Sequence, residues 1–125
     1  MRKKLLHAGL TLLFAGALFP AMAATPNTEV LKGYVTDTWC GVNRTKKPPT
    51  AECTDQCVKD RHAQYAFYNF KDKKVYILNP QSLAAKYAGQ AVVVKGTLGE
   101  HVKFETEKGW TRGAVITAES ISLAK

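Results

Sequence analysis

The three cysteines of the chain, Cys40, Cys53 and Cys57, are the residues whose type and spacing most clearly allow chemistry. Cysteine thiols pair as disulfides in an oxidising compartment, bind soft metal ions as thiolates, or act as nucleophiles. Because their number is odd, one thiol remains over after any single disulfide has formed within the chain. The spacing therefore raises two hypotheses: a disulfide that involves Cys40, and a metal site built from all three thiolates.

The disulfide hypothesis is the favoured one for an exported chain. Cys53 and Cys57 are four residues apart on an expected helix, so they share one face, but helical Cβ directions would strain a bond between them. A Cys40–Cys53 or a Cys40–Cys57 disulfide would instead attach the helix to the end of the preceding strand. A loop of this size contributes about 3 kcal/mol in the chain-entropy model.

The metal hypothesis is the alternative. Three thiolates and a fourth ligand would hold zinc or copper(I), and Asp37, Asn43 and His62 are the candidates for the fourth position. The C-x-x-x-C spacing differs from the C-x-x-C of common zinc knuckles and of redox motifs. The favoured hypothesis therefore predicts no cofactor, and the alternative predicts zinc or copper.

The first residues of the chain have the pattern of a leader for export. A basic group (Arg2 to Lys4) precedes an apolar stretch over 5–19, and Ala21-Met22-Ala23 is an A-x-A cleavage pattern. This order predicts a signal peptide over 1–23 and a periplasmic or secreted protein. The apolar stretch is shorter than the roughly 20 residues of a membrane-spanning helix, and no second such stretch follows. We therefore expect no membrane span after cleavage.

Composition limits the remaining classes. The chain has 125 residues and a formal net charge of +8, and three of the positive charges belong to the leader. Residues 24–125 then form a single domain of modest positive charge. A charged fraction of 22% beside abundant aliphatic residues excludes a disordered chain. No metalloprotease, serine-hydrolase, phosphate-loop or dinucleotide motif occurs, so the sequence offers no catalytic residue and an enzyme is the less favoured class.

Hydrophobic periodicity and turn residues predict the elements that must position the cysteines. We expect strands over 30–37, 64–70, 74–78, 90–98, 101–107 and 114–123, and helices over 50–62 and 81–87. Gly33 indicates a bend or bulge, Gly99-Glu100 a tight turn, Asn79-Pro80 a helix start, and the parity slip at 118–120 a bulge.

This order predicts a mainly β fold. A helix between the third and fourth strands is typical of a small oligonucleotide/oligosaccharide-binding (OB) barrel. We therefore expect an OB-like barrel of five to six strands with one or two short helices, in which 101–107 is the added strand. A β-sandwich-like roll is the alternative.

The cysteine blocks also resemble a known family. Gly33 to Gly41, then Cys53 to Lys59, carry the pattern D-x-x-C-G followed by C-x-x-x-C-V. This pattern is similar to that of small exported bacterial proteins with an OB-like fold and no established function, and the likeness covers about 30–98 and the last strand. The resemblance implies a fold and a compartment but no activity. Many family members have a His four residues after the first Cys, where this chain has Arg44, so a family Cys/His metal centre would lack one ligand here unless His62 replaces it.

Aromatic and basic residues supply a further set of candidates. Trp39, Arg44, Tyr68 and Trp110 are candidates for ligand binding, because OB barrels bind single strands through basic grooves and stacking rings. For an exported protein nucleic acid is an unlikely partner, and a cell-envelope polyanion or another protein fits better. The favoured function is thus an exported binding or interaction module of unknown ligand, stabilised by a disulfide. The alternative is a metal-binding or thiol-handling periplasmic protein.

Overall fold

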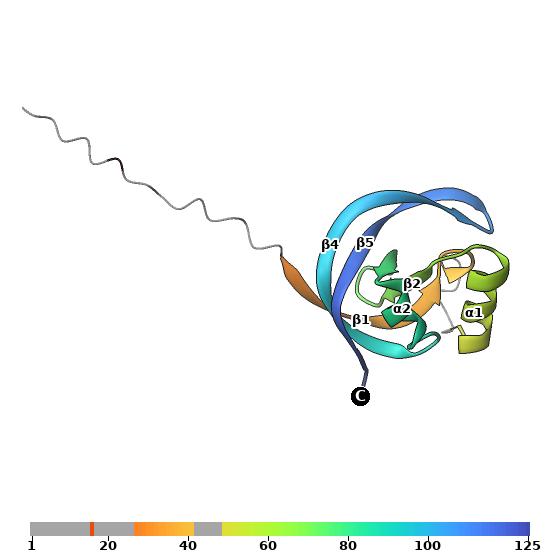
Figure 1. Cartoon of the computed structure of the whole chain (residues 1–125), viewed down its shortest axis with the longest axis horizontal. Coiled ribbons are helices and arrows are strands. Elements are labelled where there is room, and N and C mark those ends of the chain that lie inside the picture. The colour runs from red at the N-terminus through yellow and green to blue at the C-terminus, as the bar shows by residue number, and fades with distance from the viewer. Residues whose placement is uncertain (1–15, 17–26, 42–48) are drawn as a thin grey trace, which may run out of the picture.

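The computed structural model describes residues 27–41 and 49–125, together with Gly16 (Figure 1). The predicted signal peptide over 1–23 and the candidates Asn43 and Arg44 therefore lie outside the described residues, Gly16 excepted. The elements are β1 (Thr28–Asp37), α1 (Ala51–Asp60), β2 (Tyr65–Asn69), β3 (Val75–Asn79), α2 (Gln81–Ala85), β4 (Ala91–Thr106) and β5 (Gly109–Leu123). The prediction of a mainly β fold with two short helices is confirmed.

The strands form one sheet in the order β1-β2-β3-β5-β4, and β4 pairs back onto β1, so the sheet is a closed barrel. Four of the pairings are antiparallel, and the pairing of β3 with β5 is parallel. The expected hairpin over 64–78 is confirmed as β2 and β3, with Phe67 opposite Tyr76. Closure gives each strand a partner on both sides over part of its length, and the outer segments of β4 and β5 pair only with each other.

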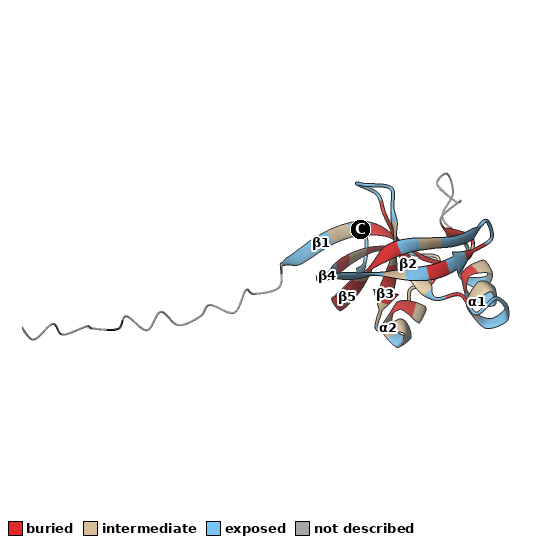
Figure 2. Cartoon of the chain, turned by 90° about the horizontal axis from the view of Figure 1, so that it is seen from above, coloured by how far each residue is buried: buried red, intermediate tan, exposed pale blue. Residues whose placement is uncertain are grey.

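The core lies inside this ring, and the alternating side chains of the strands fill it. Val35, Phe67, Leu78, Val92 and Ile116 are fully buried, one from each strand (Figure 2). Burial of each such side chain stabilises the fold by about 1.5–3 kcal/mol. The core therefore holds the end of β1 at a fixed position, and this end carries the first cysteine.

The region after the fourth strand differs from the prediction. We expected a tight turn at Gly99-Glu100 between two strands, but β4 continues through both residues as a single strand (Figure 1). Leu98 lies opposite Ile116 and His101 opposite Ala114, so β4 has one residue more than β5 there. A bulge absorbs this residue and bends the strand without ending it. The barrel consequently has five strands, and β5 begins at Gly109 instead of Ala114.

The bulge expected at 118–120 is confirmed. Lys95 lies opposite Ser120 and Gly96 opposite Ala118, which leaves Glu119 as the extra residue of β5. Gly33, by contrast, lies in regular pairing with strands on both sides. A Cβ at Gly33 would lie 2.6 Å from Cζ of Phe67, so the glycine allows a close approach of β2 and does not mark a bulge.

The expected N-cap is observed for helix α1 but not for helix α2. Thr50 is the N-cap of α1 as expected, and the helix ends at Asp60. Asn79 was expected to cap α2 but is the last residue of β3, where it pairs with Thr117 of β5. Pro80 is the N-cap instead and makes no side-chain cap bond. Within the described part of the chain, no helix has the length and apolar character needed to cross a membrane.

Candidate functional site

The end of β1 shapes the first half of the site. Asp37 is fully buried, and its Oδ1 accepts hydrogen bonds from the backbone N–H groups of Trp39 (2.9 Å) and Cys40 (3.0 Å). A side-chain carboxylate that accepts from the next two or three residues stabilises a turn. This turn reverses the chain and fixes the position of buried Cys40 beside the carboxylate.

Helix α1 supplies the other two thiols. The Thr50 side chain accepts a hydrogen bond from the backbone N–H of Cys53 (3.1 Å), which starts the helix immediately before the first of these cysteines. Cys57 follows one turn later on the same face. Thr54, between them in sequence, is fully buried, so the helix is packed along this side.

The three cysteine sulfurs lie close to one another. The Sγ atoms of Cys40 and Cys57 are 3.6 Å apart, and the three Sγ atoms lie within 4.8 Å of one another. A disulfide bond is about 2.05 Å long, so the three side chains are thiols in this structure. The sequence predicted that Cys40 would lie close to at least one helical cysteine, and the structure brings it close to both.

The electrostatic surroundings favour the protonated thiol at Cys57. Burial raises the pKa of Cys57, and the nearby charge of Asp37 raises it further, while a hydrogen bond with Cys40 acts in the opposite direction. Asp37 Oδ2 lies 3.6 Å from the Sγ of Cys40. A thiol with a raised pKa is a poor nucleophile at neutral pH, and the arrangement therefore does not support catalysis by Cys57.

An open cavity of about 390 Å³ gives access to the sulfurs. Its lining consists of the three cysteines and Trp39, Gln56, Asp60, Arg61 and Glu107. The Arg61 guanidinium lies 5.5 Å from the centre of the Trp39 ring, and the backbone N–H of Glu107 donates to the carbonyl oxygen of Trp39 (3.0 Å). The turn between β4 and β5 thus contributes to the wall of the thiol cavity. Figure 1 shows the curved β4–β5 ribbon bending over toward the side of α1.

Arg61 and Glu107 were not among the candidates from the sequence. Arg61 directly follows α1, and Glu107 lies far away in sequence at the turn of a long hairpin. No local motif marks either residue. Only the curvature of β4 and β5 brings Glu107 to Trp39.

The remaining candidates lie elsewhere. His62 is exposed, has a positive φ of 54°, and lines a neighbouring cavity together with Trp110. Asp37 borders Cys40 but is not within mutual reach of all three sulfurs. Tyr68 is buried and stacks on Tyr34 with the ring centres 4.8 Å apart, so its ring is not available to a ligand.

Trp110 is more exposed than Trp39 and Tyr68, the other described aromatic candidates. It is 64% exposed, and the Nζ of Lys103 lies 5.4 Å from the ring centre. This pair lies on the β4–β5 hairpin and lines the cavity that His62 also lines.

Comparison of the chain with protein-family models, curated proteins and solved structures finds no match.

Proposed function

We propose that this protein is an exported OB-like domain that binds a soft metal ion, zinc or copper(I), through Cys40, Cys53 and Cys57. The observation that carries the proposal is the mutual approach of three sulfurs from two separate elements to within 4.8 Å. Zn–S bonds of about 2.3 Å in a tetrahedral site correspond to sulfur separations of about 3.8 Å. The separation of 3.6 Å between Cys40 and Cys57 is close to that value.

Asp37 is a candidate fourth ligand that contacts Cys40, but it does not lie within mutual reach of all three sulfurs and would have to move to complete a zinc site. Its Oδ1 is engaged by two backbone N–H groups, while Oδ2 lies 3.6 Å from the Sγ of Cys40. Oδ1 anchors the turn and also lies 3.8 Å from the Sγ of Cys40, so both carboxylate oxygens lie beside this one sulfur. A carboxylate oxygen suits zinc, whereas copper(I) prefers the thiolates alone. His62 is not required, because it lines a different cavity.

The OB-like fold and the export of the protein form the second part of the proposal. A closed five-stranded barrel with a short helix between β3 and β4 supports the OB-like assignment of residues 24–125. The charge and apolar pattern of residues 1–23 supports export to the periplasm or beyond. An exported binding module of this kind requires no catalytic residue.

A Cys40–Cys57 disulfide is the second candidate, because these two sulfurs lie 3.6 Å apart. Its formation would release two protons and transfer two electrons to a disulfide-bearing oxidant by thiol–disulfide exchange. The sequence favoured a disulfide that involves Cys40, but a Cys40–Cys57 disulfide would leave Cys53 without a role. The closeness of all three sulfurs makes the metal site the better supported candidate.

The test is the metal content and redox state of protein isolated from its own compartment without chelators. We expect one zinc or copper ion per chain by elemental analysis and native mass spectrometry, and we expect loss of the metal in Cys53→Ser. The matched control is His62→Asn, which removes the imidazole but keeps a residue that tolerates positive φ. This variant should retain the metal.

Two results would contradict the metal proposal. A metal-free protein whose non-reduced mass is lower by two hydrogens would establish the disulfide instead. Metal that is kept by Cys53→Ser but lost from His62→Asn would place the site elsewhere.

A further inference from the structure

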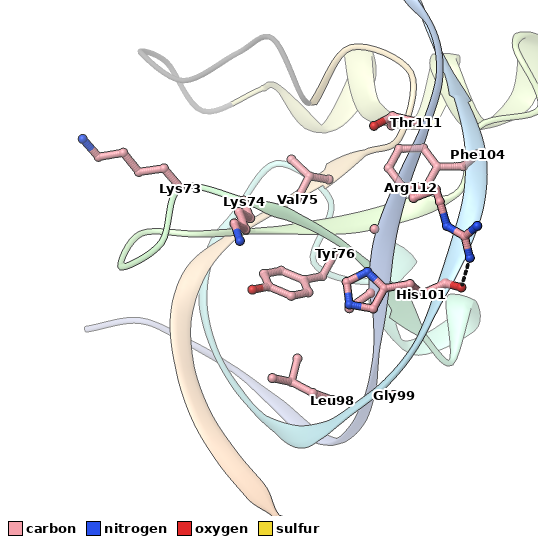
Figure 3. A pocket seen from close by; sticks show the side chains of 12 residues that line it. Lys73, Lys74, Val75, Tyr76, Leu98, Gly99, His101, Phe104, Thr111 and Arg112 are labelled. Atoms are coloured by element: carbon pink, nitrogen blue, oxygen red, sulfur yellow. Dashed lines mark hydrogen bonds between the residues drawn. The ribbon is translucent and has the colours of Figure 1, made fainter.

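A second cavity, of about 530 Å³, lies between the start of β3, the bend of β4 and the start of β5 (Figure 3). It shares no lining residue with the thiol cavity. β3 pairs with β5 only from Ile77 onward, so Val75 and Tyr76 precede the paired segment. The bulge at Gly99-Glu100 bends β4 at the same level. These two features leave a space between the strands.

The inner part of this cavity is apolar. Val75 and Tyr76 of β3, Leu98 at the bend, and Phe104 of β4 contribute to its lining. Leu98 is 39% exposed. The cavity therefore offers apolar surface that solvent can reach.

The rim is cationic. Lys73, Lys74, His101 and Arg112 contribute to the lining, and no Asp or Glu is among the residues described there. In Figure 3 the Lys74 amine and the rings of Tyr76 and His101 point into the space, while Lys73 extends outward. Arg112 donates to the carbonyl oxygen of His101 at 3.5 Å, so the guanidinium is held against the bend of β4. The rim thus has positive charge without a compensating carboxylate.

Asp72, which precedes Lys73 of the rim, is engaged in its own turn. Its Oδ1 accepts from the backbone N–H of Lys74 at 2.9 Å, and its Oδ2 accepts from the hydroxyl of Tyr76. Asp72 therefore orients Tyr76 at the edge of the cavity and does not pair with the Lys74 amine.

We propose that this cavity binds a small anionic amphiphile: a molecule with one sulfonate, carboxylate or phosphate group and an apolar body the size of one or two rings. Its apolar body would lie against Leu98, Val75 and Phe104, and its anionic group would lie near Lys74 and Arg112. The volume is within the range of small-molecule sites, which combine an apolar lining with a few polar groups. This proposal is independent of the metal site.

The probe for the test is anilinonaphthalene sulfonate, whose fluorescence increases in apolar surroundings. We expect saturable binding of one dye per folded chain and a decrease in affinity with added salt. Lys74→Glu and Arg112→Glu should each weaken binding about tenfold, because each replaces a favourable charge with a repulsive one. Lys86→Glu is the matched control, since Lys86 is exposed next to α2 and does not line the cavity.

A neutral analogue completes the test. Phenylnaphthylamine has the same rings without the sulfonate, and it should bind about tenfold more weakly and be insensitive to Lys74→Glu. The proposal is overturned if the dye shows no saturable binding to folded protein, or if Lys86→Glu weakens it as much as Lys74→Glu. Displacement of the dye by a sulfated disaccharide but not by an aryl carboxylate would overturn it in favour of a glycan site. Circular dichroism establishes that each variant is folded.

Discussion

At the scale of single residues, Asp37 links the fold to the site. The carboxylate is fully buried, accepts two backbone hydrogen bonds through Oδ1, and directs Oδ2 toward the sulfur of Cys40. The sequence identified Asp37 as a candidate metal ligand. In the structure it caps the turn, and its second oxygen lies beside the sulfur of Cys40.

Replacement of Asp37 should separate these two roles. In Asp37→Ala the buried N–H groups of Trp39 and Cys40 lose their acceptor, so we expect the free energy of unfolding to fall by about 2 kcal/mol or more. In Asp37→Asn the amide oxygen continues to accept, and we expect a smaller loss. Urea denaturation of the metal-free proteins measures both values. Equal losses in the two variants would show that the charge, and not the hydrogen-bond geometry, stabilises the turn.

Two tyrosines, Tyr65 and Tyr76, should ionise at a higher pH than a free tyrosine. Burial, together with the hydrogen bond from its hydroxyl to Asp55 Oδ1 (2.7 Å) and the charge of Asp55, raises the pKa of Tyr65 to about 12. The protonated phenol is favoured by the fold. Tyr65 therefore stabilises the protein below pH 10, and this contribution is lost as the pH rises from 10 toward 12.

Ultraviolet absorbance during a pH titration measures this ionisation. In Asp55→Asn we expect part of the late tyrosinate signal to move to lower pH, because the carboxylate no longer opposes the phenolate. Asp72→Asn is the control at Tyr76, whose pKa is also raised to about 12 by burial and Asp72. An unchanged titration in both variants would mean that burial alone delays the two phenols.

At the scale of elements, α1 presents Cys53 and Cys57 because its start is fixed by Thr50. The cap bond to the N–H of Cys53 sets the helix phase, and therefore the face on which both thiols lie. The local sequence is enough to predict this helix, because Thr50, which caps it, directly precedes its first residue in the chain.

Removal of the cap should weaken both the helix and the site. We expect Thr50→Ala to reduce the free energy of unfolding by about 1 kcal/mol, whereas Thr50→Ser should keep most of it. Chemical denaturation measures the difference. A larger loss of metal affinity than of stability in Thr50→Ala would be consistent with the role of the cap in thiol placement, and no stability change would contradict the cap assignment.

The glycines of the strands differ in their tolerance of a side chain. A Cβ at Gly33 would lie 2.6 Å from Phe67 and closer still to the backbone oxygen of Tyr68, but a Cβ at Gly99 would meet only Val115 O, at 3.4 Å. We expect Gly33→Ala to lower the thermal midpoint by several degrees, because the β1–β2 pairing must separate locally. Gly99→Ala is the matched control with a small effect. Similar midpoints for the two variants would show that β1 shifts to accommodate the methyl group.

At the scale of the whole molecule, β4 and β5 serve two purposes. Their inner segments close the barrel, with β4 paired to both β1 and β5. Their outer segments, 101–106 and 109–114, pair only with each other and form an arm whose turn reaches Trp39. Both cavities depend on this arm, because Glu107 lines one and His101 and Arg112 line the other.

The arm should open more readily than the barrel. Native-state hydrogen exchange monitored by mass spectrometry should show faster exchange over 101–114 than over 92–97, since the barrel segment is bonded on both sides and lines the core. Metal binding should slow exchange near Glu107 if the arm packs against an occupied thiol site. Equal protection of the two segments would show that the arm unfolds only with the whole domain.

Local patterns were sufficient for much of this protein. The sequence alone predicted the capped helix α1, the hairpin of β2 and β3 and the bulge at Glu119. Each of these depends on residues that are neighbours in the chain, so propensity, capping and alternation report them directly.

The tertiary structure decided the features that depend on distant partners. β4 continues through Gly99-Glu100 because β5 pairs along it and a bulge absorbs the extra residue, and Asn79 joins β3 because Thr117 lies opposite. The same long-range pairing brings Glu107 to the thiols and Arg112 to the cationic cavity. A turn or cap preference of about 1 kcal/mol is smaller than the gain from several ladder hydrogen bonds and buried side chains, so the partners override it.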